Sequence, residues 1–176
     1  MPNHVRNVVK FKNLKPDDID FLLNTIASIV SGGYKEIEYS IDFDKIIPEP
    51  QEESECPEDC IVNKDSHIES DKDRPWFDWY KWHIKFWGTK WGPYDSYTRI
   101  GKTQLTFIFS TAWSCPYPVI HRLALLGYDI EVRYADEDLG NNCGKQTYTN
   151  KEGWTYWDES EIKNPTNFAN YIWDRY

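Results

Sequence analysis

Residues 76–91 read W-F-D-W-Y-K-W-H-I-K-F-W-G-T-K-W, and the expected fold is organised around this aromatic run. Wound at about 100° per residue, residues 76–87 place three charged side chains on one narrow stripe, those of Asp78, Lys81 and Lys85. Most of the remaining circumference is aromatic. We therefore expect a helix over residues 76–87 that other parts of the protein cover on most sides.

The ends of this helix carry capping signals. Asp73 is expected as the N-cap. Gly88 is expected to end the helix because glycine adopts a left-handed backbone without steric cost. Asp78 and Lys81 are spaced to pair on the solvent-facing stripe. In the alternative interpretation, some of the rings do not fill a core but line a recognition groove together with residues 89–91.

The composition is that of a globular chain. Its 176 residues are enough for one domain, expected over residues 1–176, and 40% of them are hydrophobic. No run of about 18 apolar residues occurs, so no transmembrane helix is expected. The first residues lack the apolar region of a signal peptide. A cytoplasmic location without membrane contact is therefore expected.

The net charge of −9 is concentrated in one segment. Residues 49–73 contain ten acidic residues and two lysines, a balance of −8, so the rest of the chain is nearly neutral. Such a run is typical of a solvated, mobile loop, and its charge disfavours a phosphate backbone nearby. A loop of this length is uncommon inside a compact domain, which favours an insertion.

Outside this segment, hydrophobic periodicity predicts alternating strands and helices. Period-2 alternation predicts strands over residues 4–12, 36–43, 103–110 and 129–135. Period-3.6 stripes predict helices over residues 16–31 and 116–126. A hairpin is expected over residues 145–157 and a short last helix over residues 166–173.

The order of these elements is β-α-β, insertion, β-α-β and hairpin, which indicates an α+β fold, a ferredoxin-like split β-α-β sandwich. We expect one antiparallel sheet that contains all four alternating strands, with the helices on one face. The insertion is expected to span residues 44–102 and to contain the acidic loop 49–73 and the Trp-rich helix 76–87.

Four short motifs carry a resemblance to a known family. They are F-D-K-I-I-P at residues 43–48, W-G-T-K-W at 87–91, T-A-W-S at 111–114 and Y-A-D-E at 134–137. In this order they resemble the YubB-type ferredoxin-like-domain proteins of bacteriophages and plasmids. The resemblance implies the fold and a phage or plasmid setting, but no activity. The family name describes a fold, and no cysteine spacing here suits an iron–sulfur cluster, so no cofactor is expected.

The loop after the aromatic helix is the first candidate binding site. Trp87, Thr89, Lys90 and Trp91 surround a glycine, and Trp113 stands in the T-A-W-S motif. Their indole rings would stack a planar ligand or a sugar, and the lysine would hold a carboxylate. In the alternative, the glycine only caps the helix and the tryptophans fill the edge of the sheet.

Asp136 and Glu137, followed by Asp138, form the second candidate site at the end of a predicted strand. Neighbouring carboxylates can bind a divalent ion or act as acid and base. The alternative is an acidic turn before the hairpin. A pair between Lys90 and Asp136 or Glu137 would join both candidate sites into one structural cluster.

Four cysteines, at positions 56, 60, 115 and 143, lack the spacing of a disulfide framework and are expected as free thiols. Cys56, Cys60 and His67 have the residue types of zinc ligands, but their spacing is loose, so no metal site is assigned.

No phosphate loop, nucleophile elbow or paired-histidine motif occurs in the sequence. The preferred interpretation is therefore a non-enzymatic binding or accessory module whose partner is a host or phage protein. An enzyme that uses Asp136, Glu137 and Lys90 is the first alternative.

A single-stranded nucleic-acid binder is the second alternative, because split β-α-β sheets can present aromatic rings to single strands. Nucleic acid is disfavoured here, since the helix-free face of the sheet would carry both signs of charge and no rings. That face is expected to present Arg6, Lys10, Lys12, Glu36, Glu38, Glu131 and Arg133.

Overall fold

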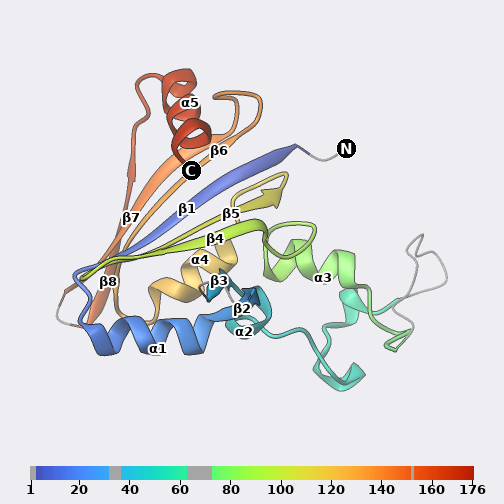
Figure 1. Ribbon diagram of the computed structural model, residues 1–176. Coiled ribbons are helices and arrows are strands. Elements are labelled where there is room, and N and C mark those ends of the chain that lie inside the picture. The colour runs from blue at the N-terminus through green and yellow to red at the C-terminus, as the bar shows by residue number, and fades with distance from the viewer. Residues whose placement is uncertain (1–2, 32–36, 63–72, 152) are drawn as a thin grey trace.

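The computed structural model describes residues 3–31, 37–62, 73–151 and 153–176 (Figure 1). In this part of the chain the main sheet has six antiparallel strands in the order β4-β5-β1-β6-β7-β8. The strands are β1 (His4–Lys12), β4 (Tyr94–Ile100), β5 (Leu105–Ala112), β6 (Asp129–Asp136), β7 (Cys143–Lys151) and β8 (Trp154–Ser160).

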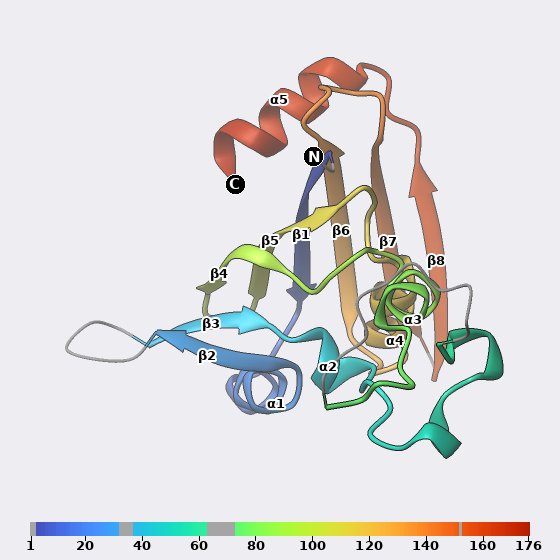
Figure 2. The same cartoon turned by 90° about the vertical axis from the view of Figure 1, so that its right-hand side faces the viewer.

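Four of these strands form a ferredoxin-like core. Helix α1 (Pro16–Ile26) follows β1, and helix α4 (Tyr117–Ala124) follows β5, so the order β4-β5-β1-β6 interleaves two β-α-β halves. The predicted α+β, ferredoxin-like fold is confirmed. The predicted hairpin is formed by β7 and β8, which extend the sheet beyond β6 (Figure 2).

For one of the four strands predicted in the main sheet, the predicted position is wrong. Residues 36–43 were expected there, but β3 (Glu38–Ile41) pairs with β2 (Ala27–Ser31) in a separate two-stranded sheet. β4 takes this position in the core sheet, although its residues lie inside the predicted insertion 44–102. That insertion therefore cannot extend past residue 93. The alternation along β3 correctly predicts that one face of the strand is buried, since Ile41 is only 1% exposed. It cannot predict which other strand β3 pairs with.

The first helix is shorter than predicted. It ends at Ile26 rather than near residue 31, and residues 27–31 are extended as β2. Ile29 and Val30 are β-branched, favour strands and are more than half exposed, so they do not continue the buried helical stripe. The predicted stop at Gly32 and Gly33 lies outside the described residues.

Both faces of the sheet are covered. α1 and α4 pack on one face, as predicted, over residues such as Val9 and Phe107. The expectation of helices on one face only is wrong, because α5 (Pro165–Arg175) packs on the opposite face. Ala169 and Ile172 of α5 meet three buried sheet residues there, Val8, Ile108 and Ala135. This second core explains why an apolar Val8 interrupts the alternation of β1.

The segment between β3 and β4 is built from short elements. They are α2 (Phe43–Ile46), the 3-10 helices η1 (Glu53–Glu55) and η2 (Glu58–Cys60), and α3 (Trp79–Phe86). α3 is the predicted Trp-rich helix, although it begins three residues later than predicted. In Figure 1 it lies to the right of the sheet, beyond α4. Within the described ranges, no helix has both the length and the apolar character needed to cross a bilayer.

Candidate functional site

Asp78 fixes the start of α3. Its carboxylate accepts the Lys81 N–H at 3.1 Å and pairs with Lys81 Nζ at 3.2 Å, so the predicted Asp78–Lys81 pair is confirmed. The N-cap is Asp78 and not Asp73 as predicted. The Asp78 side chain is fully buried rather than solvent-facing. A buried, capping carboxylate holds the first turn in one position.

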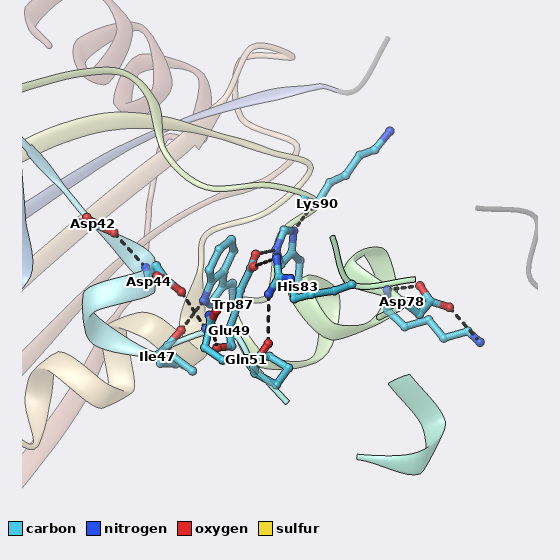
Figure 3. Close-up of polar contacts among 12 residues, drawn as sticks. Asp42, Asp44, Ile47, Glu49, Gln51, Asp78, His83, Trp87 and Lys90 are labelled. Carbon is cyan, nitrogen blue, oxygen red and sulfur yellow. Dashed lines mark hydrogen bonds and ion pairs between the residues drawn. The ribbon is translucent and has the colours of Figure 1, made fainter. Parts of the chain in front are cut away.

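His83 joins α3 to the segments on both sides of it (Figure 3). Its Nε2 lies 2.5 Å from Glu49 Oε1, and its Nδ1–H donates to the Lys90 carbonyl at 2.9 Å. The imidazole stacks on the Trp87 indole, with ring centroids 4.0 Å apart. Glu49 also accepts from the Arg74 guanidinium at 2.6 Å. The hydrogen bond from His83, followed by that from Arg74, lowers the pKa of Glu49, although burial opposes the shift.

Two of the predicted site residues are structural. The Trp87 side chain is buried, and its Nε1–H donates to the Ile47 carbonyl at 2.9 Å (Figure 3). Thr89 is 0% exposed, and its hydroxyl both donates to Ala112 O and accepts from Ala112 N–H. The core therefore already uses the polar atoms of Trp87 and Thr89, and neither side chain belongs to the open surface around Lys90.

Gly88 ends α3 as predicted. Its φ of +77° lies in the left-handed region, and a Cβ at this position would stand 2.7 Å from Pro118 Cδ. The chain can therefore turn tightly against α4 only with glycine here. This turn leads Lys90 and Trp91 out of the core towards the surface.

Trp113 lies at a corner where three parts of the chain meet. Its backbone φ of +75° is unusual for a large side chain. Its N–H donates to the Asn3 carbonyl at 2.8 Å, and its own carbonyl accepts from Asn142 Nδ2 at 3.0 Å. Lys90 Nζ lies 5.6 Å from the Trp113 ring and 4.7 Å from the Trp91 ring. Of the first candidate site, the structure brings Lys90, Trp91 and Trp113 together.

A groove of about 730 Å³ runs between the outer face of α3 and Trp113. We call it the α3 groove. It is lined by Glu58, Asp59, Cys60, Tyr80, Lys81, Ile84, Lys85 and Trp113. Tyr80 meets Trp113 edge to face at 6.1 Å, and Ile84 and Trp113 are each 39% exposed. The rim is charged, with Lys85 Nζ 2.9 Å from Asp59 Oδ2.

The sequence analysis allows that some rings of α3 line a recognition groove, but it does not single out the two apolar α3 residues that do. Tyr80 and Ile84 were placed on the covered part of the helix, although they stand four positions apart and directly precede Lys81 and Lys85. An apolar i, i+4 pair bordering the charged stripe was the signal that could have found them.

The acidic turn holds the N-terminal end of β1. Glu137 exchanges hydrogen bonds with the His4 backbone, accepting the His4 N–H through its carboxylate at 3.0 Å and donating its own N–H to His4 O. Asp136 is 4% exposed, and its carbonyl accepts from Trp173 Nε1 at 2.8 Å. No ion pair joins Lys90 to either carboxylate in the described ranges, and neither acid lines the α3 groove. The two candidate sites therefore do not form one cluster.

Three of the cysteines, Cys56, Cys60 and Cys115, are buried, and Cys143 is partly exposed. All four are unpaired, and burial raises the pKa of Cys60 to about 11 and also raises that of Cys56. His67, the third residue of the possible zinc set, lies outside the described residues. Among the residues that are described, no group of three or more His, Cys, Asp or Glu side chains could hold a metal ion.

The sheet face proposed for nucleic acid is neutralised and partly covered. Glu131 pairs with Lys12 at 2.9 Å and with Arg133 at 2.8 Å, and the Arg6 guanidinium lies over the Trp173 ring of α5. Glu38 belongs to the small sheet, and Glu36 is not among the described residues. This arrangement leaves little basic surface for a phosphate backbone.

Comparison with known protein families places part of the chain in a described family. A family model described as the ferredoxin-like domain in Api92-like protein matches residues 86–174, just over half of the chain. The matched region runs from the end of α3 through β4, β5, α4, β6, β7 and β8 into α5. No curated protein and no solved structure matches the chain. The family description names a fold and no activity.

Proposed function

The chain belongs to the family defined by the ferredoxin-like domain in Api92-like protein, and we propose that it uses this fold as a non-enzymatic binding module for another protein. The proposed recognition surface is the α3 groove with Lys90 and Trp91 beside it. The proposal includes a YubB-type phage or plasmid setting and a partner of host or phage origin, which the resemblance of the four motifs supports. It also includes a cytoplasmic location, which the sequence favours because it has no long apolar run and no signal-peptide pattern.

The backbone of Trp113 is the observation that carries this proposal. A left-handed conformation at a bulky residue costs about 1 to 3 kcal/mol and persists only where the surroundings enforce it. Here the bonds to Asn3 and Asn142 enforce it from both sides. The effect is to hold a partly exposed indole in one position before a partner arrives, which reduces the entropy lost on binding.

The walls of the groove define the apolar part of the partner. Trp113, Tyr80 and Ile84 line the groove together, with the Trp113 and Tyr80 rings in edge-to-face contact, and all three are large side chains that water reaches. A partner that places one aromatic or branched aliphatic side chain in the groove against these three residues would bury this surface, in the manner of an interface hot spot.

Lys90 defines the polar part of the partner. Its ammonium group lies over two indole rings, and in the described part of the chain it has no carboxylate within ion-pair distance. A carboxylate beside the apolar anchor would complete a charge-assisted contact there. The partner segment that fits is therefore an apolar anchor next to an acidic residue.

Selection from a randomised peptide library on the purified protein tests this function. We expect enriched peptides to carry an aromatic or aliphatic residue next to Asp or Glu, and to bind Trp113→Gly at least about tenfold more weakly than the unmodified protein. Trp154→Ala is the matched control, because it removes an exposed indole that does not line the groove. Peptides without this pattern, or peptides that bind Trp113→Gly equally well, would contradict the proposal.

A further inference from the structure

The two edges of the main sheet differ. At the β4 edge, Thr98 Oγ1 donates to the Tyr39 carbonyl of β3, and Tyr97 OH donates to the Tyr176 carbonyl after α5. At the β8 edge, no backbone hydrogen bond from the described residues reaches the outer side of the strand. An uncovered edge strand is a template for pairing with another strand.

Among the residues that the structure describes, the β8 edge carries the most exposed aromatic rings. Trp154 is 71% exposed, Trp157 63% and Tyr156 58%. Three such rings expose on the order of 400 Å² of apolar surface on one short strand. Because successive side chains of a strand point to opposite faces, Trp154 and Tyr156 lie on one face of this edge and Trp157 lies on the other. A strand that pairs along the edge would cover part of the exposed rings on both faces.

The geometry of the hairpin fixes which backbone groups point outward. Asn150 lies opposite Thr155 in the β7–β8 ladder, and the Asn150 N–H donates to Asp129 Oδ1 on the β6 side at 3.0 Å. Asn150 and Thr155 are therefore a non-hydrogen-bonded pair. Because such pairs alternate along an antiparallel ladder, Thr155, Trp157 and Glu159 direct their N–H and C=O groups away from β7.

We propose that a second copy of this chain pairs with β8, strand against antiparallel strand, about a two-fold axis at Trp157. Trp157 then lies opposite Trp157 of the second copy, and Thr155 lies opposite Glu159. All of these residues direct their backbone groups outward, so every such pair can form both hydrogen bonds of an antiparallel ladder. The two main sheets become one continuous sheet, and both uncovered edges are removed.

The charges of β8 favour this register over its neighbours. With the axis at Trp157, Asp158 lies opposite Tyr156, whose hydroxyl can donate to it, and no acid lies directly opposite another acid. A register centred on Glu159 places two carboxylates directly opposite each other. A register centred on Thr155 runs into the turn at Gly153 and shortens the ladder. Strand length and charge therefore select the same axis.

Sedimentation velocity of the full chain over a concentration series tests the dimer. We expect a concentration-dependent dimer that Trp157→Lys weakens at least about tenfold. Glu159→Pro is expected to weaken it as well, because this proline removes only an outward N–H and spares the β7–β8 ladder. Tyr171→Lys, which changes an exposed aromatic residue of α5, is the control and keeps the dimer. Circular dichroism checks that each variant folds.

Oxidative cross-linking tests the register. Directly opposite residues have Cα atoms about 5.5 Å apart, within disulfide range. Trp157→Cys is therefore expected to give a covalent dimer on a non-reducing gel. Thr155→Cys is not, since its equivalent in the second copy is four residues away along the strand. A monomer at every concentration would overturn the proposal, and a cross-link in Thr155→Cys alone would overturn its register.

Discussion

The Glu49 carboxylate shows how one residue can hold a peripheral element in place. It binds His83 of α3 through one oxygen and Arg74 through the other, and its side chain is only 17% exposed. His83 in turn reaches the Lys90 carbonyl. Glu49 therefore fixes the orientation of α3 and of the loop that presents Lys90 and Trp91.

Glu49→Gln should lower stability at neutral pH by about 2 to 4 kcal/mol, because it removes the largely buried negative charge that His83 and the Arg74 guanidinium both contact. The pKa of Glu49 is lowered from an ordinary value near 4.5 when the protein folds. Its contribution is therefore fully present above about pH 4.5 and is lost as the pH falls through the folded-state pKa. Urea unfolding from pH 6 to pH 3 should show a shallower acid decline for the variant.

Glu161→Gln is the control for this experiment, since it removes an exposed carboxylate on the turn after β8. It should reproduce the acid decline of the unmodified protein. If the stability of Glu49→Gln falls as steeply with decreasing pH as that of Glu161→Gln, Glu49 does not have the assigned role.

Trp113→Gly separates a functional role of Trp113 from a structural one. Glycine accepts a φ of +75° without strain, which returns about 1 kcal/mol or more and offsets the lost contacts with Tyr80 and Lys90. We expect the free energy of unfolding, measured by thermal denaturation, to change by no more than about 1 kcal/mol, while peptide binding weakens at least about tenfold. A variant that unfolds much more easily would show that the indole is needed for folding.

At the scale of elements, α5 is the part whose role the sequence least revealed. Its apolar positions Ala169 and Ile172 are buried against Val8 and Ile108 on the sheet face that was expected to be free. The helix was predicted, but its position depends on a contact between residues more than sixty positions apart. Local periodicity contains no information on such a contact.

Ile172→Ala should destabilise the protein by about 2 to 5 kcal/mol, because it opens a cavity in this second core. Asp174→Ala, an exposed change on the same helix, should stay within about 0.5 kcal/mol. Guanidinium denaturation followed by circular dichroism measures both. Equal midpoints for the two variants would mean that α5 does not pack stably on the sheet.

The two β-α-β halves show which elements a sequence reveals. Five elements were predictable because each buries an unbroken face in the main core, namely β1, β5, β6, α1 and α4. β4 was missed because Y-D-S-Y-T-R-I has few aliphatic residues. Its pairing with β5 also shifts register between Tyr94 and Tyr97, and Asp95 has a φ of +45°. An irregular edge strand of this kind needs less apolar sequence, since it is packed less deeply than a central one.

The candidate site was predictable only in part for a related reason. The sequence identified Lys90, Trp91 and Trp113, because indoles and a lysine near a glycine turn are recognisable locally. It also assigned Trp87 and Thr89 to the surface, although their partners are backbone atoms of Ile47 and Ala112. Which tryptophans are buried depends on segments that are distant along the chain.

At the scale of the whole molecule, the ferredoxin-like sheet is a scaffold with recognition features at its margins. α3 and Trp113 form the α3 groove on one side, and on another side β8 forms a sheet edge that no strand of the described residues pairs with. Between these two regions, helices cover both faces of the main sheet, with α1 and α4 on one face and α5 on the other. Both proposed interactions can therefore occur without a rearrangement of the fold.

The most direct test of the proposed function is an NMR titration of the ¹⁵N-labelled tryptophan side chains with a selected peptide. The indole signal of Trp113, assigned by its loss in Trp113→Gly, should shift in proportion to binding. The signals of Trp154 and Trp157 on β8 should stay in place. A Trp113 signal that does not move while the β8 signals do would contradict the α3 groove as the binding site.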